Sequence, residues 1–192
     1  MNFVNKKVLI TGASRGIGKA TALAFAEKGA QVGINFRSNL EEAQKTRGEL
    51  PGEGHRLFQA DISEKANCQS LIDDFVEIFG QLDVLVNNAG ISIFHEIDQV
   101  DFNHWTNAWE NTFKTNLFAA ANMTYCAAQA MIKTGGGRIV NVSSRGAFRG
   151  EPTKPAYGAS KAALNAMTQS LAKKLAPHHI YLGVVAPGFT ET

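Results

Sequence analysis

Short apolar segments rich in β-branched residues alternate along the chain with longer amphipathic segments. Helical patterns lie near residues 16–28, 40–48, 64–79, 101–133 and 156–176, and the apolar segments cover residues 7–11, 31–36, 55–60, 82–87, 138–143 and 180–185. Uniformly apolar strands that alternate with helices indicate a parallel sheet that is buried on both faces. The sequence therefore predicts an α/β fold, a single doubly wound domain with helices on both faces of a parallel sheet, over residues 1–192.

Composition and charge exclude several classes of partner. The chain has 192 residues, is 44% hydrophobic and carries a formal charge of +2, so it can bury a core but has no excess charge for nucleic acid. Cys68 and Cys126 have neither metal-ligand nor disulfide spacing, which is typical of the reducing cytoplasm. The first apolar segment is too short for a signal peptide or a membrane span. We expect a cytoplasmic protein that binds neither nucleic acid nor membranes, and no metal, because no ligand pattern unites the histidines His55, His95, His104, His178 and His179.

A glycine-rich turn follows the first predicted strand. Its sequence, TGASRGIG (residues 11–18), places Gly12, Gly16 and Gly18 before a helix. Such a turn lets backbone N–H groups approach a pyrophosphate, and the helix N-terminus adds roughly half a positive charge. Gly18 would also let the helix pack close to the sheet. Three glycines alone also suit an ordinary tight turn, but their place between strand and helix favours a dinucleotide site in a Rossmann-type domain.

The spacing G-xxx-G-x-G resembles the short-chain dehydrogenase/reductase family, whose hallmark is T-G-xxx-G-x-G. Further motifs of that family occur in its order over essentially the whole chain: NNAG at 87–90, Asn116, SS at 143–144, Y-xxx-K at 157–161 and PGFTET at 187–192. The resemblance implies hydride transfer between a nicotinamide and a carbonyl or secondary alcohol. The chain's opening and residues 157–176 resemble 3-oxoacyl-(acyl carrier protein) reductases, and also relatives that act on sugars, steroids and small ketones.

Tyr157 and Lys161 stand four residues apart and therefore share one face of a helix. An ammonium beside a phenol favours the phenolate, which makes tyrosine a usable general acid or base; alone, the pair also suits a packed tyrosine and a solvated lysine. The resemblance implies that Tyr157 protonates the carbonyl oxygen and that Lys161 holds the nicotinamide ribose. It also implies that Ser144 binds the substrate oxygen, with Ser143 as a rival, and that Asn116 holds a relay water. Asn116 alone would be read as a side chain that stabilises its own helix.

The end of the second predicted strand bears on the choice of cofactor. Enzymes that prefer NAD place a carboxylate there, on the ribose 2′-hydroxyl, but here the position falls on Phe36. Arg37 follows it and Arg15 lies in the glycine turn, and guanidinium groups match phosphate bidentately. Each arginine alone suits a solvated surface, but together they predict NADP(H). The cofactor-binding residues expected from the motifs are Gly12, Ser14, Arg15, Gly16, Ile17, Gly18, Arg37, Ser38, Asp61, Ile62, Asn88, Ala89, Gly90, Tyr157, Lys161, Pro187, Gly188, Thr190 and Thr192.

Two functions stay open. One is an NADP(H)-dependent oxidoreductase acting on a small-molecule or acyl-carrier-bound carbonyl compound, and the other is a non-catalytic NADP(H)-binding sensor or scaffold. The joint presence of Asn116, Ser144, Tyr157 and Lys161 favours the enzyme, because a sensor has no chemical use for all of them.

Assembly and chain length give two further expectations. The segment 101–133 carries more large apolar side chains than one stripe against a sheet needs, which predicts a homodimer or homotetramer; these side chains are Trp105, Trp109, Phe113, Leu117 and Phe118. Members of the family usually continue for several dozen residues beyond the PGFTET motif. We therefore expect that the C-terminal part of the usual family domain is missing here, with an exposed sheet edge at the sixth strand.

Overall fold

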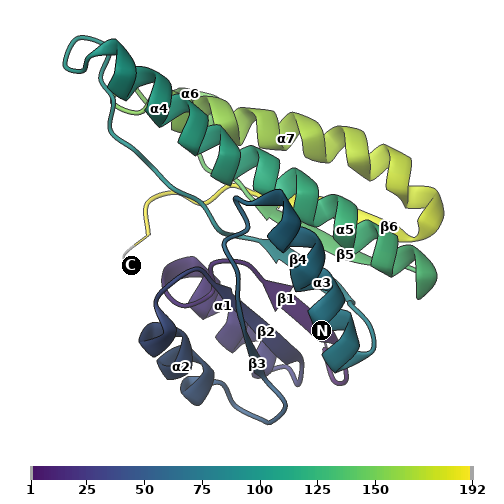
Figure 1. Cartoon of the computed structure of the whole chain (residues 1–192). Coiled ribbons are helices and arrows are strands. Elements are labelled where there is room, and N and C mark those ends of the chain that lie inside the picture. The colour runs from purple at the N-terminus through teal and green to yellow at the C-terminus, as the bar shows by residue number, and fades with distance from the viewer. Residues whose placement is uncertain (1, 191–192) are drawn as a thin grey trace.

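One sheet of six parallel strands organises the chain, in the order β3-β2-β1-β4-β5-β6 (Figure 1). The computed structural model describes residues 2–190. The strands are β1 (Lys7–Ile10), β2 (Gln31–Phe36), β3 (Arg56–Gln59), β4 (Val84–Asn87), β5 (Gly137–Val142) and β6 (Ile180–Val185). Successive strands run outward from β1 on one side and from β4 on the other. The carboxyl ends of β1 and β4 therefore form the switch point at which doubly wound sheets bind ligands.

Helices connect the strands, and the predicted α/β fold is confirmed. They are α1 (Gly16–Ala26), α2 (Leu40–Glu49), α3 (Lys65–Phe79), α4 (Phe102–Phe113), α5 (Ala119–Lys133), α6 (Gly146–Arg149) and α7 (Pro155–Leu175). Two short turns complete them, the π-helical η1 (Lys114–Phe118) and the 3-10 turn η2 (Ala176–His178). The predicted helix 101–133 is thus interrupted by η1. The segment 144–155 between β5 and α7 contains the single turn α6, which ends where Gly150 adopts a φ of 74°.

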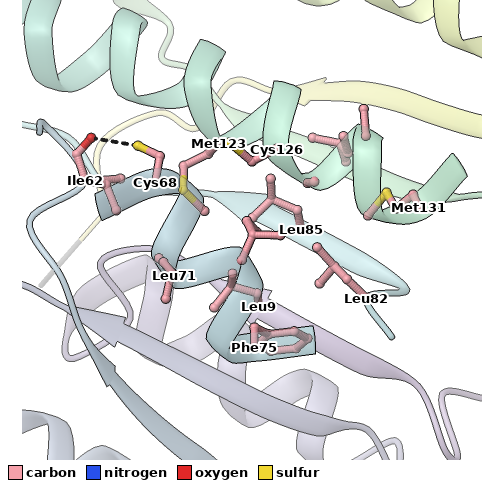
Figure 2. Close-up of a cluster of buried hydrophobic side chains, with 14 of the residues drawn as sticks. Leu9, Ile62, Cys68, Leu71, Phe75, Leu82, Leu85, Met123, Cys126 and Met131 are labelled. Atoms are coloured by element: carbon pink, nitrogen blue, oxygen red, sulfur yellow. Dashed lines mark hydrogen bonds between the residues drawn. The ribbon is translucent and has the colours of Figure 1, made fainter. Parts of the chain in front are cut away.

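A large apolar cluster covers one face of the sheet. Side chains of α3 and α5 pack there against the central strands, and Figure 2 shows them interleaved above the sheet. Each fully buried side chain of this size stabilises the fold by about 1.5–3 kcal/mol. The labelled members are Leu9, Ile62, Cys68, Leu71, Phe75, Leu82, Leu85, Met123, Cys126 and Met131.

The opposite face is covered more thinly, by α1 and α2. Ala22 and Ala26 of α1 are buried against Val8 and Ile10 of β1 and their neighbours in β2. Because alanine is small, α1 lies close to the sheet, and its first turn starts directly above the carboxyl end of β1. This packing fixes where the glycine-rich turn points.

A buried network of amides and hydroxyls joins the sheet to the helices. Asn87 of β4 donates a hydrogen bond to Asn141 Oδ1 of β5 at 2.8 Å, and to Thr124 Oγ1 of α5 at 3.1 Å. Asn141 in turn donates to Thr168 Oγ1 of α7 at 2.7 Å. Leaving such a buried amide without a partner costs about 1–3 kcal/mol. The network therefore sets the position of α7, which carries two of the candidate catalytic residues, relative to β5.

The described part of the chain has two sheet edges and no membrane-spanning element. β3 and β6 are the outermost strands among residues 2–190. Along β6, Tyr181 is 55% exposed and Val185 is 48% exposed. In the same residues, no helix combines the length and the apolar character that crossing a membrane requires.

Candidate active site

The glycine-rich turn after β1 is held by the turn after β4. The hydroxyl of Thr11 accepts hydrogen bonds from the backbone N–H groups of Asn88 at 3.0 Å and Ala89 at 3.1 Å. The Asn88 amide donates to the carbonyl oxygens of Thr11 at 2.9 Å and Gly12 at 3.0 Å. Four hydrogen bonds thus join two turns that lie more than seventy residues apart, and the predicted residues Asn88, Ala89 and Gly12 meet at the switch point.

Two of the glycines are required by this close approach. Gly12 has a φ of +62°, and a Cβ on it would lie 2.9 Å from the Cα of Ala89. A Cβ on Gly18 would lie 2.5 Å from the Gly12 carbonyl oxygen and 2.6 Å from the Asn88 amide nitrogen. No real Cβ approaches so closely, so side chains at these positions would force the two turns apart.

The first turn of α1 offers free backbone donors. The helix begins after Arg15, whose side chain makes no capping hydrogen bond, and its first turn holds the predicted Gly16, Ile17 and Gly18. Thr46 of α2 donates to the carbonyl oxygen of Ser14 at 2.9 Å, which fixes the turn from the other side. An uncapped helix N-terminus at a switch point is an anion-binding geometry.

Lys161 is buried at the end of β5. Its side chain is 4% exposed, and its Nζ donates to the Val142 carbonyl oxygen at 2.8 Å. Burial lowers the pKa of this ammonium from 10.5 to about 8. A Cβ on Gly90 would lie 3.4 Å from Lys161 Nζ and 3.2 Å from Asn116 Oδ1. The bare glycine thus opens the space where the predicted Lys161 and Asn116 approach each other.

Asn116 lies in the π-helical turn η1 and binds outside its own helix. Its Oδ1 accepts from the Ile91 N–H at 2.8 Å, and its amide donates to the Ile91 carbonyl at 2.9 Å and to Ser160 Oγ of α7 at 3.2 Å. The interpretation of Asn116 as a side chain that only stabilises its own helix is therefore wrong. π-Helical turns recur at functional sites, and the sequence carried no signal for this one.

Tyr157 lies one helical turn before Lys161 on α7 and is half-buried. Its ring centroid is 5.9 Å from Lys161 Nζ and also 5.9 Å from Lys154 Nζ. Two cationic side chains therefore flank this phenol, of which the sequence analysis identified only Lys161.

The two adjacent serines after β5 have different partners. Ser143 is buried, and its hydroxyl donates to the Lys161 carbonyl oxygen at 3.2 Å. Ser144 is half-buried, and its Oγ accepts from the Gly146 N–H at 3.1 Å, a bond that does not use its own hydroxyl proton. The rival Ser143 is thus engaged inside the fold, and Ser144 is the serine with a proton to donate.

A cavity of about 400 Å³ lies beside the ends of β2 and β3, and Arg37 and Asp61 line it. Burial opposes ionisation of Asp61, but hydrogen bonds from Ser63 and the charges of Arg37 and Lys114 outweigh it and lower the pKa of this carboxyl. Arg37 and the other two predicted residues of this side, Ser38 and Arg15, are exposed.

Phe36 and Ile62, which adjoin Arg37 and Asp61 in the sequence, have side chains that are buried in the protein. Phe36 is only 3% exposed, so its ring packs inside the domain. The side chain of Ile62 belongs to the core, and its carbonyl accepts from Cys68 Sγ at 3.2 Å (Figure 2). Only the backbone of Ile62 therefore remains to meet a ligand.

The segment after β6 runs beside the loop after β5. The Pro187 carbonyl accepts from the Arg145 N–H at 3.1 Å, and the Arg145 guanidinium lies 3.9 Å from the ring centroid of Phe189. The predicted Gly188 and Thr190 are exposed there. Thr192, also predicted to bind cofactor, lies outside the described residues. Across residues 2–190, no group of three or more His, Cys, Asp or Glu side chains is arranged to hold a metal ion.

One buried residue beside the site was not predicted. His95 is fully buried, and its Nε2 accepts from the Ala156 N–H at 3.2 Å, next to Tyr157. No spacing in the sequence links residues 95 and 156, so only the folded chain shows their contact.

Comparison with known proteins gives concordant matches. The family model described as short chain dehydrogenase matches residues 6–192. A 3-oxoacyl-(acyl-carrier-protein) reductase, FabG, of Thermotoga maritima is 38% identical over 100% of this chain and 77% of the reductase. An L-rhamnose 1-dehydrogenase (NAD(P)(+)) of Sphingomonas sp. is 39% identical over 95% of this chain and 72% of the dehydrogenase. The crystal structure of an NAD+-bound xylitol dehydrogenase superposes with a TM-score of 0.91 at 31% identity, covering 100% of this chain and 73% of the other.

The buried ammonium of Lys161 predicts a pH-dependent stability. Between pH 8 and 10.5 the unfolded lysine binds a proton that the folded one has lost, so the free energy of unfolding rises with pH. Relative to a Lys161→Met variant, which cannot titrate there, wild type should gain up to about 3 kcal/mol across this window. Urea denaturation of both proteins at a series of pH values measures the difference. Lys173→Met, an exposed lysine of the same helix, should show no such trend, and a pH-independent difference for Lys161→Met would refute the assignment.

Proposed function

Because the chain belongs to the short-chain dehydrogenase family, we propose that it is an NADP(H)-dependent oxidoreductase that interconverts a carbonyl compound and a secondary alcohol. The observation that carries this proposal is the approach of Lys161 and Asn116 across Gly90, one helical turn from Tyr157. The alternative, a non-catalytic NADP(H)-binding sensor, gives no reason for a buried ammonium beside a phenol.

The residues present fit a nicotinamide dinucleotide. The uncapped N-terminus of α1 and the bare Gly12 and Gly18 leave room and donors for a pyrophosphate. Asp61 and Arg37 line the cavity expected for the adenosine end. Lys161 Nζ makes one hydrogen bond, to Val142, and an ammonium has three donors, so two remain for ribose hydroxyls.

The chain's own groups supply the proton and orient the substrate. A bound nicotinamide would supply or accept the hydride at the carbonyl carbon. Tyr157 donates its phenolic proton to the carbonyl oxygen, and the resulting phenolate is stabilised by the Lys161 ammonium. Ser144 donates a hydrogen bond to the same oxygen and holds it near the phenol. Asn116, bound to the backbone of Ile91, holds the water through which the proton is replaced.

The substrate class is a carbonyl compound that is free or carried on an acyl carrier protein, including a 3-oxoacyl thioester. Similarity to the Thermotoga maritima reductase supports the thioester. Nearly equal identity to an L-rhamnose 1-dehydrogenase supports a small-molecule substrate just as well. NADPH oxidation in the presence of a panel of ketones, 3-oxoacyl thioesters and sugars separates these substrates, and the absence of turnover with every one would favour the sensor.

Replacement of Tyr157 by Phe tests the proton donor. The change removes only the hydroxyl, so folding and NADPH binding should stay nearly intact while turnover falls by about 10²–10⁴-fold, the usual contribution of a positioned acid. Steady-state NADPH oxidation and a fluorescence titration of the cofactor measure the two effects. Tyr181→Phe, an exposed tyrosine on β6, is the matched control and should keep wild-type activity. A Tyr157→Phe variant with more than a tenth of the wild-type rate would refute the assignment.

Arg37 is proposed to select the cofactor by binding its 2′-phosphate, with Arg15 approaching from the glycine turn. A charge-assisted contact is worth about 1.5–3 kcal/mol, and the lower end, about tenfold, suits an exposed arginine. Arg37→Ala should therefore reduce the preference for NADPH over NADH about tenfold, and Arg37→Asp should reverse it by adding repulsion. Because Phe36 is buried, the carboxylate is better introduced at the exposed position 37.

Titration of each protein with NADPH and NADH at two salt concentrations measures the preference, which salt should weaken in wild type. Arg47→Ala removes the same charge at the far end of α2 and should leave the preference unchanged. Equal affinity of the wild type for both cofactors would contradict the proposal of NADP(H) dependence.

A homo-oligomer is proposed through the outer face of η1 and α5. Phe118 is 56% exposed, Tyr125 is 65% exposed and Ile132 is 39% exposed, and their spacing of seven residues places them on one stripe. Trp105 and Trp109, which also suggested an interface, are instead half-buried against His95. Sedimentation should show a dimer or tetramer at micromolar concentration, and Phe118→Asp combined with Tyr125→Asp should yield monomers. A wild-type monomer would overturn the proposal.

A further inference from the structure

We propose that His95 is a positioning residue for Tyr157, acting as the N-terminal cap of α7 through the backbone N–H of Ala156; its role in turnover rests on the function proposed above. The two residues that meet here are distant in sequence. His95 belongs to the loop after β4, and Ala156 immediately precedes the phenol that donates the proton.

The first turn of α7 lacks a cap from its own neighbourhood. Pro155 has no N–H, and the Tyr157 N–H bonds back to the Lys154 carbonyl at 3.0 Å. Lys154 stands at the position where serine or aspartate usually caps a helix, and its side chain makes no capping bond. The Ala156 N–H remains, in a residue with no exposed surface. A buried N–H without an acceptor is strongly disfavoured, and His95 Nε2 accepts it at 3.2 Å.

Hydrogen bonds and two aromatic rings hold the His95 imidazole in place. Its Nδ1 donates to the Ile93 carbonyl oxygen at 2.9 Å, so the neutral tautomer with the proton on Nδ1 satisfies both ring nitrogens. Its backbone N–H donates to the Thr153 carbonyl at 3.0 Å. The rings of Trp105 and Trp109 lie edge-on to it, with centroids 5.4 Å and 6.4 Å away. A ring held in this way transmits its position to the helix that it caps.

The short segment 90–95 thereby lies beside Lys161 and Asn116 and contacts the residue that precedes Tyr157. Gly90 adjoins Lys161 Nζ, Ile91 binds both polar ends of the Asn116 amide, and His95 caps the residue before Tyr157. This segment begins where β4 ends, in the turn that also holds the cofactor loop. Tyr157 and Lys161 share α7, so we infer that this stretch of backbone adjusts the first turn of α7, and with it Tyr157, relative to Asn116.

Two substitutions separate the bond to Ala156 from the local bond to Ile93. In His95→Gln the side-chain oxygen reaches the place of Nε2 and can accept from Ala156. In His95→Asn the shorter amide reaches only the place of Nδ1 and keeps the bond to Ile93. Displacing a catalytic group by about 1 Å can cost up to a hundredfold in rate. We expect kcat to fall by about tenfold to a hundredfold in His95→Asn and by less than about threefold in His95→Gln, with KM and the NADPH dissociation constant nearly unchanged in both.

Amide hydrogen exchange of Ala156, followed by NMR, tests the hydrogen bond from the Ala156 N–H to His95 independently of turnover. The Ala156 N–H should exchange slowly in wild type and His95→Gln and rapidly in His95→Asn. Rapid exchange in the wild type would overturn the proposal even if both variants failed to fold, and so would equal kcat values in the two variants. A wild type without turnover on any carbonyl substrate would refute the proposed function instead, and the exchange measurement would still decide whether His95 caps the helix.

Discussion

The hydrogen bonds between Thr11 and the Asn88–Ala89 backbone are the contact on which the site depends. They close the gap between the carboxyl ends of β1 and β4, where the strand order reverses. The glycine-rich turn can approach so closely only because Gly12 and Gly18 lack side chains. With this contact in place, the N-terminus of α1 and the segment 90–95 face the same space. The proposed cofactor site and the proposed catalytic groups therefore both depend on this one contact.

The ammonium of Lys161 shows that the site is not arranged for stability. The buried ammonium makes one hydrogen bond, to the Val142 carbonyl, which offsets only part of the cost of its desolvation. The lowered pKa of Lys161 reflects the cost that remains. Replacing it with an apolar side chain would remove the penalty. The buried ammonium beside a phenol therefore destabilises the fold locally. A ligand that accepts its remaining hydrogen bonds would offset this destabilisation.

Most of the fold was predictable because it follows from local periodicity. Each predicted strand and each long helix is present. The apolar runs of β1, β4 and β5 reflect burial on both faces of the sheet. The amphipathic pattern of α3 reflects burial on one face of the helix. Placement of Gly12, Asn88 and Gly90 at one switch point follows from the same topology. Positions at the ends of parallel strands meet by geometry, whatever their sequence separation.

The features that sequence reasoning missed all depend on contacts between distant residues. The π-helical turn at Asn116 accompanies the bonds of its side chain to Ile91, and the cap of α7 comes from His95. Neither leaves a periodic or compositional trace. For the two serines after β5, by contrast, the resemblance to the family favoured Ser144 over Ser143. The structure distinguishes them because the Ser143 hydroxyl bonds to the backbone of α7, whereas the Ser144 hydroxyl oxygen meets the backbone N–H of Gly146 in the following turn.

Backbone geometry alone does not choose the cofactor. The chain superposes closely on a dehydrogenase crystallised with NAD+, and a relative at 39% identity is described with NAD(P)(+). Selection must therefore lie in side chains around the adenosine ribose rather than in the shared sheet and turns. Phe36 is turned into the domain and leaves no carboxylate there, whereas Arg37 stands at the mouth of the cavity with Asp61. We therefore propose that a single residue after β2 selects the cofactor, while the hydrogen bonds between Thr11 and Asn88 stay the same.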